Sequence, residues 1–219
     1  MNPPEIVLFD LDGTLTDAAP GIVNGMRIVF DRFGIEQPGE TTMRTYLGPP
    51  LAVTWREHYN FTDEQITQAL AIYREYYHDV GMFENEVFDG IPELLQQLNN
   101  DDVILATATS KPDFSATRII EHFGLRDHFT YIGAANLEGT RDSKALVIEH
   151  TLEQLKANST THRIVMVGDR HHDVHGAREH GIDTIGVLWG YGDAEELTEA
   201  GAIALVQNPK ELRAEILSG

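Results

Sequence analysis

The 219-residue sequence contains no cysteine, and this absence excludes disulfides, thiolate metal sites and thiol catalysis. Cations are also scarce: 16 Lys and Arg stand against 35 Asp and Glu, which leaves a formal charge of −19. Because such a surface repels a phosphate backbone and no basic stripe offsets it, we expect no nucleic-acid partner. No apolar run approaches the roughly 20 residues that span a bilayer. The N-terminal residues show no signal-peptide pattern, so we expect a cytoplasmic protein without a membrane partner.

Short, continuous apolar runs, many of them β-branched, recur along the chain, and several end at polar residues. Such runs are typical of strands that are buried on both faces of a sheet. In chain order they are Ile6–Phe9, Val103–Ala108, Ile164–Val167, Thr184–Trp189 and the weaker Ile203–Val206. Helical patterns fill most of the gaps between them. This alternation predicts an α/β fold, a doubly wound parallel sheet in which ligands bind beyond the carboxyl ends of the strands.

A long helical stretch interrupts the alternation directly after the first strand. The region from Asp17 to Val87 shows helical patterns and no convincing strand, and one of its helices is marked by the capping-box pattern Thr62–Gln65. We therefore expect two domains. An α/β core would comprise residues 1–16 and 88–219, and a helical cap inserted after the first strand would comprise residues 17–87.

The segment Asp10-Leu11-Asp12-Gly13-Thr14 carries the strongest chemical signal. Alternate residues at the end of a strand point the same way, so the carboxylates of Asp10 and Asp12 can share one site. Mutual repulsion and burial raise the pKa of one such partner, which suits a nucleophile paired with a proton donor. Gly13 permits the sharp turn or close backbone approach that a bound anion needs. The plain alternative is an Asp-Gly turn after a strand.

Three further groups of polar residues follow later strands or open helices. Thr109 and Ser110 follow the second strand, where hydroxyls and backbone amides can hold a phosphate at a helix start. Lys144 opens a helix, and Asp169 with Asp173 follows a later strand. Taken alone, each of these is more often a helix cap, a solvated charge or a turn residue. Their joint placement beside the first aspartates predicts one shared site.

These residues and their order resemble the haloacid dehalogenase superfamily of phosphatases, especially its phosphoglycolate phosphatase-like and 5′-nucleotidase-like members. The resemblance extends from about Glu5 to Val206. Its four motifs are Asp10–Thr14, Thr109–Pro112, Lys144 and Gly168–Asp173. Arg170, within the fourth motif, stands where many of these relatives have Ser or Thr, and it favours the 5′-nucleotidase-like branch.

The resemblance implies a role for each of the catalytic and phosphate-binding residues. Asp10 would attack phosphorus and form an aspartyl-phosphate, a route open to carboxylates. Asp12 would protonate the leaving oxygen and then activate the hydrolytic water. Thr109, Ser110 and Lys144 would bind the phosphoryl oxygens.

The resemblance also implies a Mg²⁺ cofactor, held by Asp10, the backbone carbonyl of Asp12, Asp169 and Asp173. Electrostatics supports the need for it, since two unit like charges at 4 Å repel by about 4 kcal/mol at an effective dielectric constant of 20. A phosphate dianion that faces several carboxylates would bind poorly without compensation. Mg²⁺ adds two positive charges and polarises the phosphoryl group.

The implied substrate and partner is a small phosphorylated metabolite of the phosphoglycolate or nucleoside 5′-monophosphate type. A pyrophosphatase, a sugar-phosphate phosphatase or a phosphomutase are the alternatives within the superfamily. The segment Leu47–Leu51 resembles a loop that these relatives place over the active site, so we expect Arg44, Gly48 and Pro49 to select the substrate. For Arg44, a solvated helix charge is the equally compatible alternative. The sequence leaves the oligomeric state open.

Three other classes of function are compatible with parts of the sequence. His171, His172 and His175 lie close together on an expected helix and could bind zinc, but they match no known zinc spacing, which favours exposed helix histidines. A phosphoacceptor signalling domain also combines acidic residues, Thr and Lys around Mg²⁺, but lacks a helical insertion. A catalytically inactive scaffold would not need all four motifs.

Overall fold

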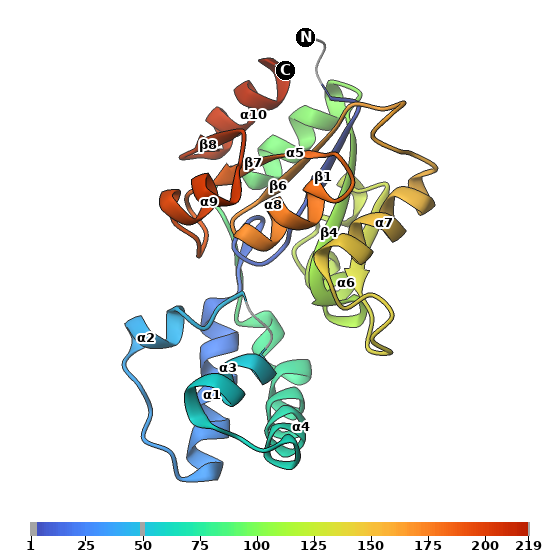
Figure 1. Ribbon diagram of the computed structural model, residues 1–219. Coiled ribbons are helices and arrows are strands. Elements are labelled where there is room, and N and C mark those ends of the chain that lie inside the picture. Colours follow the sequence, from blue (N-terminus) through green and yellow to red (C-terminus); the bar gives the residue numbers. More distant parts are fainter. Residues whose placement is uncertain (1–3, 49–50, 219) are drawn as a thin grey trace. The chain divides into compact units, whose positions relative to one another are not determined.

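The computed structural model describes residues 4–48 and 51–218 of the chain (Figure 1). The chain divides into two compact units. We call Met1–Thr16 together with Val87–Gly219 the core unit, and Asp17–Glu86 the helical unit. At their boundary, β2 (Thr16–Asp17) pairs with β3 (Glu86–Val87). These two-residue strands correct the expectation that residues 17–87 hold no strand, while a capping role for the helical unit stays a prediction.

The core unit is built on a six-stranded parallel sheet, which confirms the predicted α/β class. Its strands run in the spatial order β5-β4-β1-β6-β7-β8. Their bounds are β1 Ile6–Phe9, β4 Ile104–Pro112, β5 Tyr131–Ala135, β6 Ile164–Gly168, β7 Asp183–Val187 and β8 Ala204–Val206. The chain leaves β1 toward β4 on one side and later returns to β6 on the other. The strand order therefore reverses at β1, where open α/β sheets bind their ligands.

The direction of each connection between parallel strands determines which face of the sheet its helix covers. Right-handed connections place the helices between β1, β4 and β5 on one face of the sheet, and those between β5, β6, β7 and β8 on the other. In agreement, α7 contacts α8 and α8 contacts α9, whereas α5 contacts α10. The bounds are α5 Ile91–Asn100, α6 Asp113–His122, η2 Arg126–His128, α7 Lys144–Leu155, α8 His171–Arg178, α9 Ala194–Ala200 and α10 Pro209–Ser218. No helix within residues 4–48 and 51–218 has both the length and the hydrophobicity to span a bilayer.

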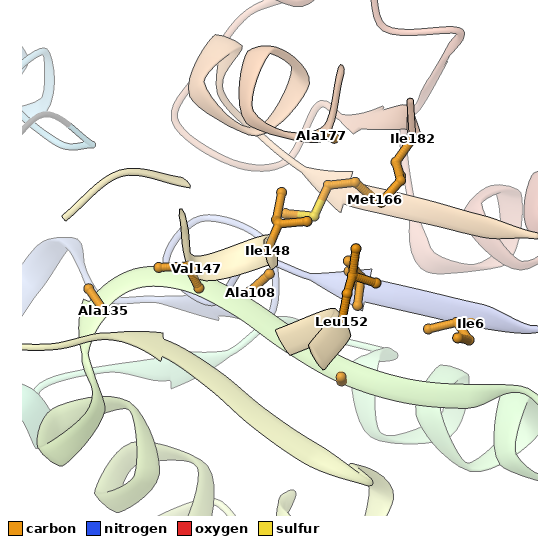
Figure 2. Close-up of a cluster of buried hydrophobic side chains, with 11 residues drawn as sticks. Ile6, Ala108, Ala135, Val147, Ile148, Leu152, Met166, Ala177 and Ile182 are labelled. Atoms are coloured by element: carbon orange, nitrogen blue, oxygen red, sulfur yellow. The ribbon is translucent and has the colours of Figure 1, made fainter. Parts of the chain in front are cut away.

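Helix α7 is fixed against the sheet by a buried apolar cluster (Figure 2). Val147, Ile148 and Leu152 belong to one face of α7, and Figure 2 shows Ile148 beside Met166 of β6. At the start of the helix, the Ser143 side chain accepts a hydrogen bond from the Leu146 N–H at 3.3 Å, as an N-cap does. Packing and cap together determine where the first residue of α7 lies.

The helical unit contains α1 Ala19–Phe33, α2 Glu40–Arg44, α3 Leu51–Tyr59, α4 Asp63–Asp79 and the short 3₁₀ helix η1 Gly81–Phe83. The predicted capping box is confirmed: the Gln65 N–H donates to Thr62 Oγ1 at 3.2 Å, and the Thr62 N–H donates to Gln65 Oε1 at 2.9 Å. The interior of the unit combines aliphatic side chains with packed aromatic rings. Trp55 is fully buried and stacks with Phe61, with ring centroids 6.3 Å apart.

Two features of the sheet differ from the sequence prediction. Strand β5 was not predicted, because Tyr-Ile-Gly-Ala-Ala contains mostly small residues and gives little of the bulky β-branched signal. Strand β4 does not end at Ala108 but continues to Pro112. Thr109 and Ser110 therefore lie inside the strand rather than at a helix start.

Candidate active site

The predicted residues of the core unit converge at the carboxyl edge of the sheet because β1, β4 and β6 are parallel and in register. Phe9 of β1 lies opposite Thr107 of β4 and Val167 of β6. Asp10 follows directly and donates its N–H to the Val167 carbonyl at 2.9 Å. Asp169 follows β6 at the same edge. The fold thus brings Asp10 and Asp169 into one site, although they are 159 positions apart in the sequence.

The loop after β1 turns sharply around Gly13. This residue has a φ of 83°, which favours glycine. The turn is closed by hydrogen bonds from Gly13 N–H to the Thr16 carbonyl at 2.8 Å and from Leu15 N–H to the Leu11 carbonyl at 2.9 Å. A Cβ atom on Gly13 would lie 2.2 Å from Asp169 Oδ2. Glycine is therefore required here both for the turn and for the close approach of Asp169.

Lys144, the first residue of α7, is buried between two carboxylates. Its Nζ lies 2.9 Å from Asp10 Oδ1 and 2.7 Å from Asp173 Oδ1, and it donates to the Ala108 carbonyl at 2.9 Å. Burial by itself lowers the pKa of Lys144, but the Asp10 and Asp173 carboxylates outweigh burial and leave this pKa raised. The site therefore contains one permanent cation in contact with the predicted nucleophile.

Asp169 and Asp173 are completely buried. Asp169 accepts hydrogen bonds from Thr14 Oγ1 at 3.2 Å and from the Tyr191 N–H at 2.7 Å, and Asp173 accepts one from the Arg170 N–H at 3.1 Å. Burial raises the pKa of both carboxyls, to about 6 for Asp173, and the neighbouring carboxylates add to the shift. Ionised carboxylates are disfavoured in this arrangement unless a further cation is present.

Asp10, Asp169 and Asp173 form a cluster suited to a metal ion. One carboxylate oxygen from each lies within 4.8 Å of the others, and no other such group of His, Asp or Glu occurs among the described residues. In addition, Asp12 Oδ1 is buried without a hydrogen-bond partner. Oxygen ligands from carboxylates are those that Mg²⁺ and Ca²⁺ prefer, so the donor set fits a hard divalent cation.

Lys111 belongs to the site, although the sequence predicts no role for it. Its Nζ lies 2.8 Å from Asp12 Oδ2, and its side chain is 5% exposed. Burial raises the pKa of Asp12, and Lys111 opposes that shift. The two-residue period of a strand could have indicated that Lys111 lies on the same side as Thr109. On β4 both residues are buried, while Ser110 between them is exposed.

The predicted selectivity residues belong to the helical unit. Arg44, at the end of α2, is exposed, and its Nη2 lies 3.6 Å from Glu40 Oε1 one turn earlier. Gly48 is exposed and has a φ of 108°. Pro49 lies outside the described residues. The part that these residues play in substrate selection stays a prediction.

The histidines on α8 do not assemble a metal site in the described part of the chain. His171 places Nδ1 2.6 Å from Glu196 Oε1, and its ring centroid lies 3.9 Å from that of His172 and 5.6 Å from that of His175. Burial, His171 and Arg170 lower the pKa of His172 to about 4, so this ring is neutral near pH 7. The geometry favours a hydrogen-bonding role for His171 over zinc binding.

The chain belongs to the haloacid dehalogenase-like hydrolase family, whose model matches residues 7–187. This match confirms the resemblance that was based on the four motifs. The fold agrees as well. The structure solved for "a predicted phosphatase from Clostridium acetobutylicum" superposes with a TM-score of 0.93 at 40% identity, covering 99% of this chain and 100% of that one.

Two relatives of known name are similar over most of this chain. A 5′-nucleotidase of Pseudomonas aeruginosa is 40% identical over 191 residues, which are 87% of this chain and 86% of the relative. The tyrosine-protein kinase PtkA of Mycobacterium tuberculosis is 45% identical over 192 residues, which are 88% of this chain. The chain spans only 65% of the length of PtkA.

Proposed function

We propose that this chain is a Mg²⁺-dependent phosphomonoesterase in which Asp10 is the nucleophile. The observation that carries the proposal is the placement of Lys144 Nζ 2.9 Å from Asp10, with the carboxylates of Asp169 and Asp173 in the same buried cluster. Membership of a hydrolase family and the similarity to a 5′-nucleotidase and to a solved phosphatase support it.

The residues that would hold Mg²⁺ are Asp10, Asp169 and Asp173, with the backbone carbonyl of Asp12. These carboxylates are close enough to repel one another strongly, and Lys144 compensates only part of their charge. The bound ion would neutralise this excess charge and polarise the phosphoryl group. Lys144 and the backbone and hydroxyl groups of Thr109 and Ser110 would bind the remaining phosphoryl oxygens.

The covalent steps belong to Asp10 and Asp12. An Asp10 carboxylate oxygen would attack phosphorus, so that an O–P bond forms to the enzyme while the bond to the ester oxygen breaks. Asp12 would give its proton to the leaving oxygen, and the burial that raises the pKa of Asp12 favours the protonated form that this step needs. Asp12 would then take a proton from the water that attacks the aspartyl-phosphate, which releases phosphate and restores Asp10.

The proposed substrate is a small phosphorylated metabolite of the nucleoside 5′-monophosphate or phosphoglycolate type. The similarity to the 5′-nucleotidase supports the first of these, in agreement with Arg170 of the fourth motif. Pyrophosphate and sugar phosphates remain the alternatives, because each presents the same group to Asp10. The helical unit would act as the cap that chooses between them, and the expected compartment is the cytoplasm.

The experiment that tests this function is a panel of phosphate monoesters assayed for released phosphate, with Mg²⁺ and after chelation. The panel contains nucleoside 5′-monophosphates, phosphoglycolate, sugar phosphates, pyrophosphate and an aryl phosphate. We expect hydrolysis only with the metal, and the highest kcat/KM on one of the first two classes. Full activity after exhaustive chelation would contradict the metal site, and no hydrolysis of any ester would contradict the phosphatase.

A second candidate is phosphoryl transfer to protein tyrosine, which the 45% identity to PtkA favours. Asp10 would accept the γ-phosphoryl group of ATP, with release of ADP, and a tyrosine hydroxyl would replace water as the acceptor. Hydrolysis remains the first proposal because the 5′-nucleotidase is matched over 86% of its own length and PtkA over 65%. Incubation with labelled ATP and a tyrosine peptide distinguishes the two, since only a kinase labels the peptide.

A further inference from the structure

Glu196, in the first turn of α9, makes an unusual set of contacts. A single carboxylate oxygen, Oε1, accepts hydrogen bonds from Arg170 Nε at 2.9 Å, from the His171 backbone N–H at 2.9 Å and from His171 Nδ1 at 2.6 Å. The Glu196 backbone N–H is itself bound by the Asp193 side chain at 2.8 Å, which caps α9. Glu196 thus links α9 to a turn that lies about 25 residues earlier in the chain.

The turn that Glu196 holds is the one that carries two of the proposed metal ligands. Arg170 and His171 directly follow Asp169, and His171 is two residues before Asp173. The Arg170 N–H also donates to Asp173 Oδ2 at 3.1 Å. A displacement of Arg170 or His171 would therefore move the backbone to which both carboxylates are attached.

The loop before α9 contacts the same turn. The Tyr191 N–H donates to Asp169 Oδ2 at 2.7 Å, and a Cβ atom on Gly190 would lie 2.4 Å from Asp169 Cβ. The segment from Gly190 to Glu196 therefore supports the metal-binding turn at its first aspartate and at the two residues that follow it. Of these contacts, only those of Glu196 are made by a charged side chain that a substitution can remove without changing the backbone.

The charge of Glu196 is part of this contact. Burial alone raises the pKa of Glu196, but the His171 backbone N–H and the Arg170 side chain outweigh it and hold the pKa at about 2. The carboxylate is therefore ionised under all ordinary conditions. Charge-assisted hydrogen bonds to an arginine and to a backbone N–H are stronger than neutral ones, and they fix orientation as well as distance.

We propose that Glu196 is a positioning residue, which holds Arg170 and His171 and thereby places Asp169 and Asp173 for a divalent cation. Glu196 lies outside the four sequence motifs, and it touches neither the ion nor the substrate in this role. The inference rests on the proposed Mg²⁺ site. Partners that orient metal ligands typically change metal affinity by about 10- to 100-fold when they are removed.

Calorimetric titration of the metal-free protein with Mg²⁺ tests this role without relying on turnover. We expect Glu196→Ala to raise the Mg²⁺ Kd by about tenfold or more, and Glu196→Gln, which keeps the shape and an acceptor oxygen but loses the charge, to raise it by about threefold to tenfold. Glu199→Ala is the matched control, because Glu199 lies one turn further along α9 and is exposed, whereas Glu196 is half-buried. We expect the control to leave the Kd within about twofold of wild type, because solvent and salt screen the effect of an exposed charge on a distant site.

Activity assays add a reading that a purely structural role would not give. The Mg²⁺ concentration for half-maximal activity should rise in Glu196→Ala in parallel with the Kd, while kcat at saturating Mg²⁺ stays within about threefold of wild type, because Glu196 does not act on the phosphoryl group. A folded Glu196→Ala with an unchanged Kd overturns the proposal, and so does an equal loss in Glu199→Ala. If Glu196→Ala does not fold, an unchanged Kd in Glu196→Gln overturns it. Absence of Mg²⁺ binding by the wild-type protein would instead contradict the metal site itself.

Discussion

The two units of this chain differ in whether they bury charged side chains. In the core unit, the fully or almost fully buried residues include four charged side chains: Lys111, Lys144, Asp169 and Asp173. In the helical unit, across residues 17–48 and 51–86, no charged residue is buried, and the interior combines aliphatic side chains with aromatic contacts. One of these is the stack of Tyr73 on Tyr77, with ring centroids 5.1 Å apart.

This difference indicates that the two units have different roles. Burying a charge costs free energy unless partners compensate, so a cluster of buried charges is retained where chemistry requires it. The helical unit bears no such cost, since its described charged side chains are all exposed or half-buried. We therefore expect substitutions of the buried charged residues in the core unit to affect all substrates equally, and substitutions of any substrate-contacting residue in the helical unit to affect them selectively.

The largest expected effect is that of Asp10→Asn. An amide cannot attack phosphorus, so kcat should fall by more than about a hundredfold on every substrate. The fold should survive, because the substitution removes one of three mutually repelling carboxylates at the site. Circular dichroism and a thermal melt check the fold, and steady-state assays with Mg²⁺ check the rate.

Asp183→Asn is the control for that experiment. Asp183 is an exposed carboxylate at the start of β7, so it lies at the opposite end of the strand from the carboxyl edge. We expect its kcat to stay near that of the wild type. Retention of more than about a hundredth of wild-type kcat in folded Asp10→Asn would refute the assignment of the nucleophile.

The sequence predicted the residues at the carboxyl edge of the sheet better than the strand and the side chains that surround them. Asp10, Lys144 and Asp169 could be named because each follows a strand or opens a helix, and because the motifs resemble a known family. Strand β5 was missed because small residues carry little propensity signal. Lys111 lies in the second motif, but its contact with Asp12 depends on how far β4 extends, which the sequence does not show.

Glu196 illustrates a second kind of limit. It is one of three glutamates in the seven-residue helix α9, with Glu195 and Glu199 as the others. Nothing local in the sequence separates it from them. Its importance comes from contacts with Arg170 and His171, which only the packing of α8 against α9 creates. Long-range contacts of this kind are outside the reach of periodicity and capping rules.

The effect of intermediate size is the pH dependence of the stabilisation by Mg²⁺. In the metal-free protein, burial raises the pKa of Asp173 from 3.8 to about 6 and also raises that of Asp169. Between about pH 4 and pH 6 the folded state therefore binds protons that the unfolded chain has released, so the stability of the metal-free protein falls as pH rises through this window. Mg²⁺ needs the ionised carboxylates and competes with these protons.

The Mg²⁺-induced rise in Tm should accordingly be small at about pH 5 and clearly larger at about pH 7.5. Thermal melts with Mg²⁺ and with a chelator at both pH values measure it. Asp173→Asn should weaken the pH dependence, because it removes one of the two titrating carboxyls. A Mg²⁺ shift that is equal at both pH values in the wild type would contradict the buried carboxylate site, and with it the contrast between the two units.

The smallest expected effect tests the helical unit through Arg44. Its side chain is 52% exposed and its contact with Glu40 is long, at 3.6 Å, so the guanidinium is available to a second anionic group on a substrate. Losing a charged hydrogen bond costs roughly 1.5–3 kcal/mol, so Arg44→Ala should lower kcat/KM by about tenfold or more on the preferred dianionic or carboxylated substrate. It should barely change the hydrolysis of an aryl phosphate that lacks the second group. Arg56→Ala, which removes an equally exposed arginine paired with Asp63, should affect neither substrate. Equal loss on both substrates in Arg44→Ala would indicate a folding defect, and no loss on either would make Arg44 a solvated surface charge and leave selection to other residues of the helical unit.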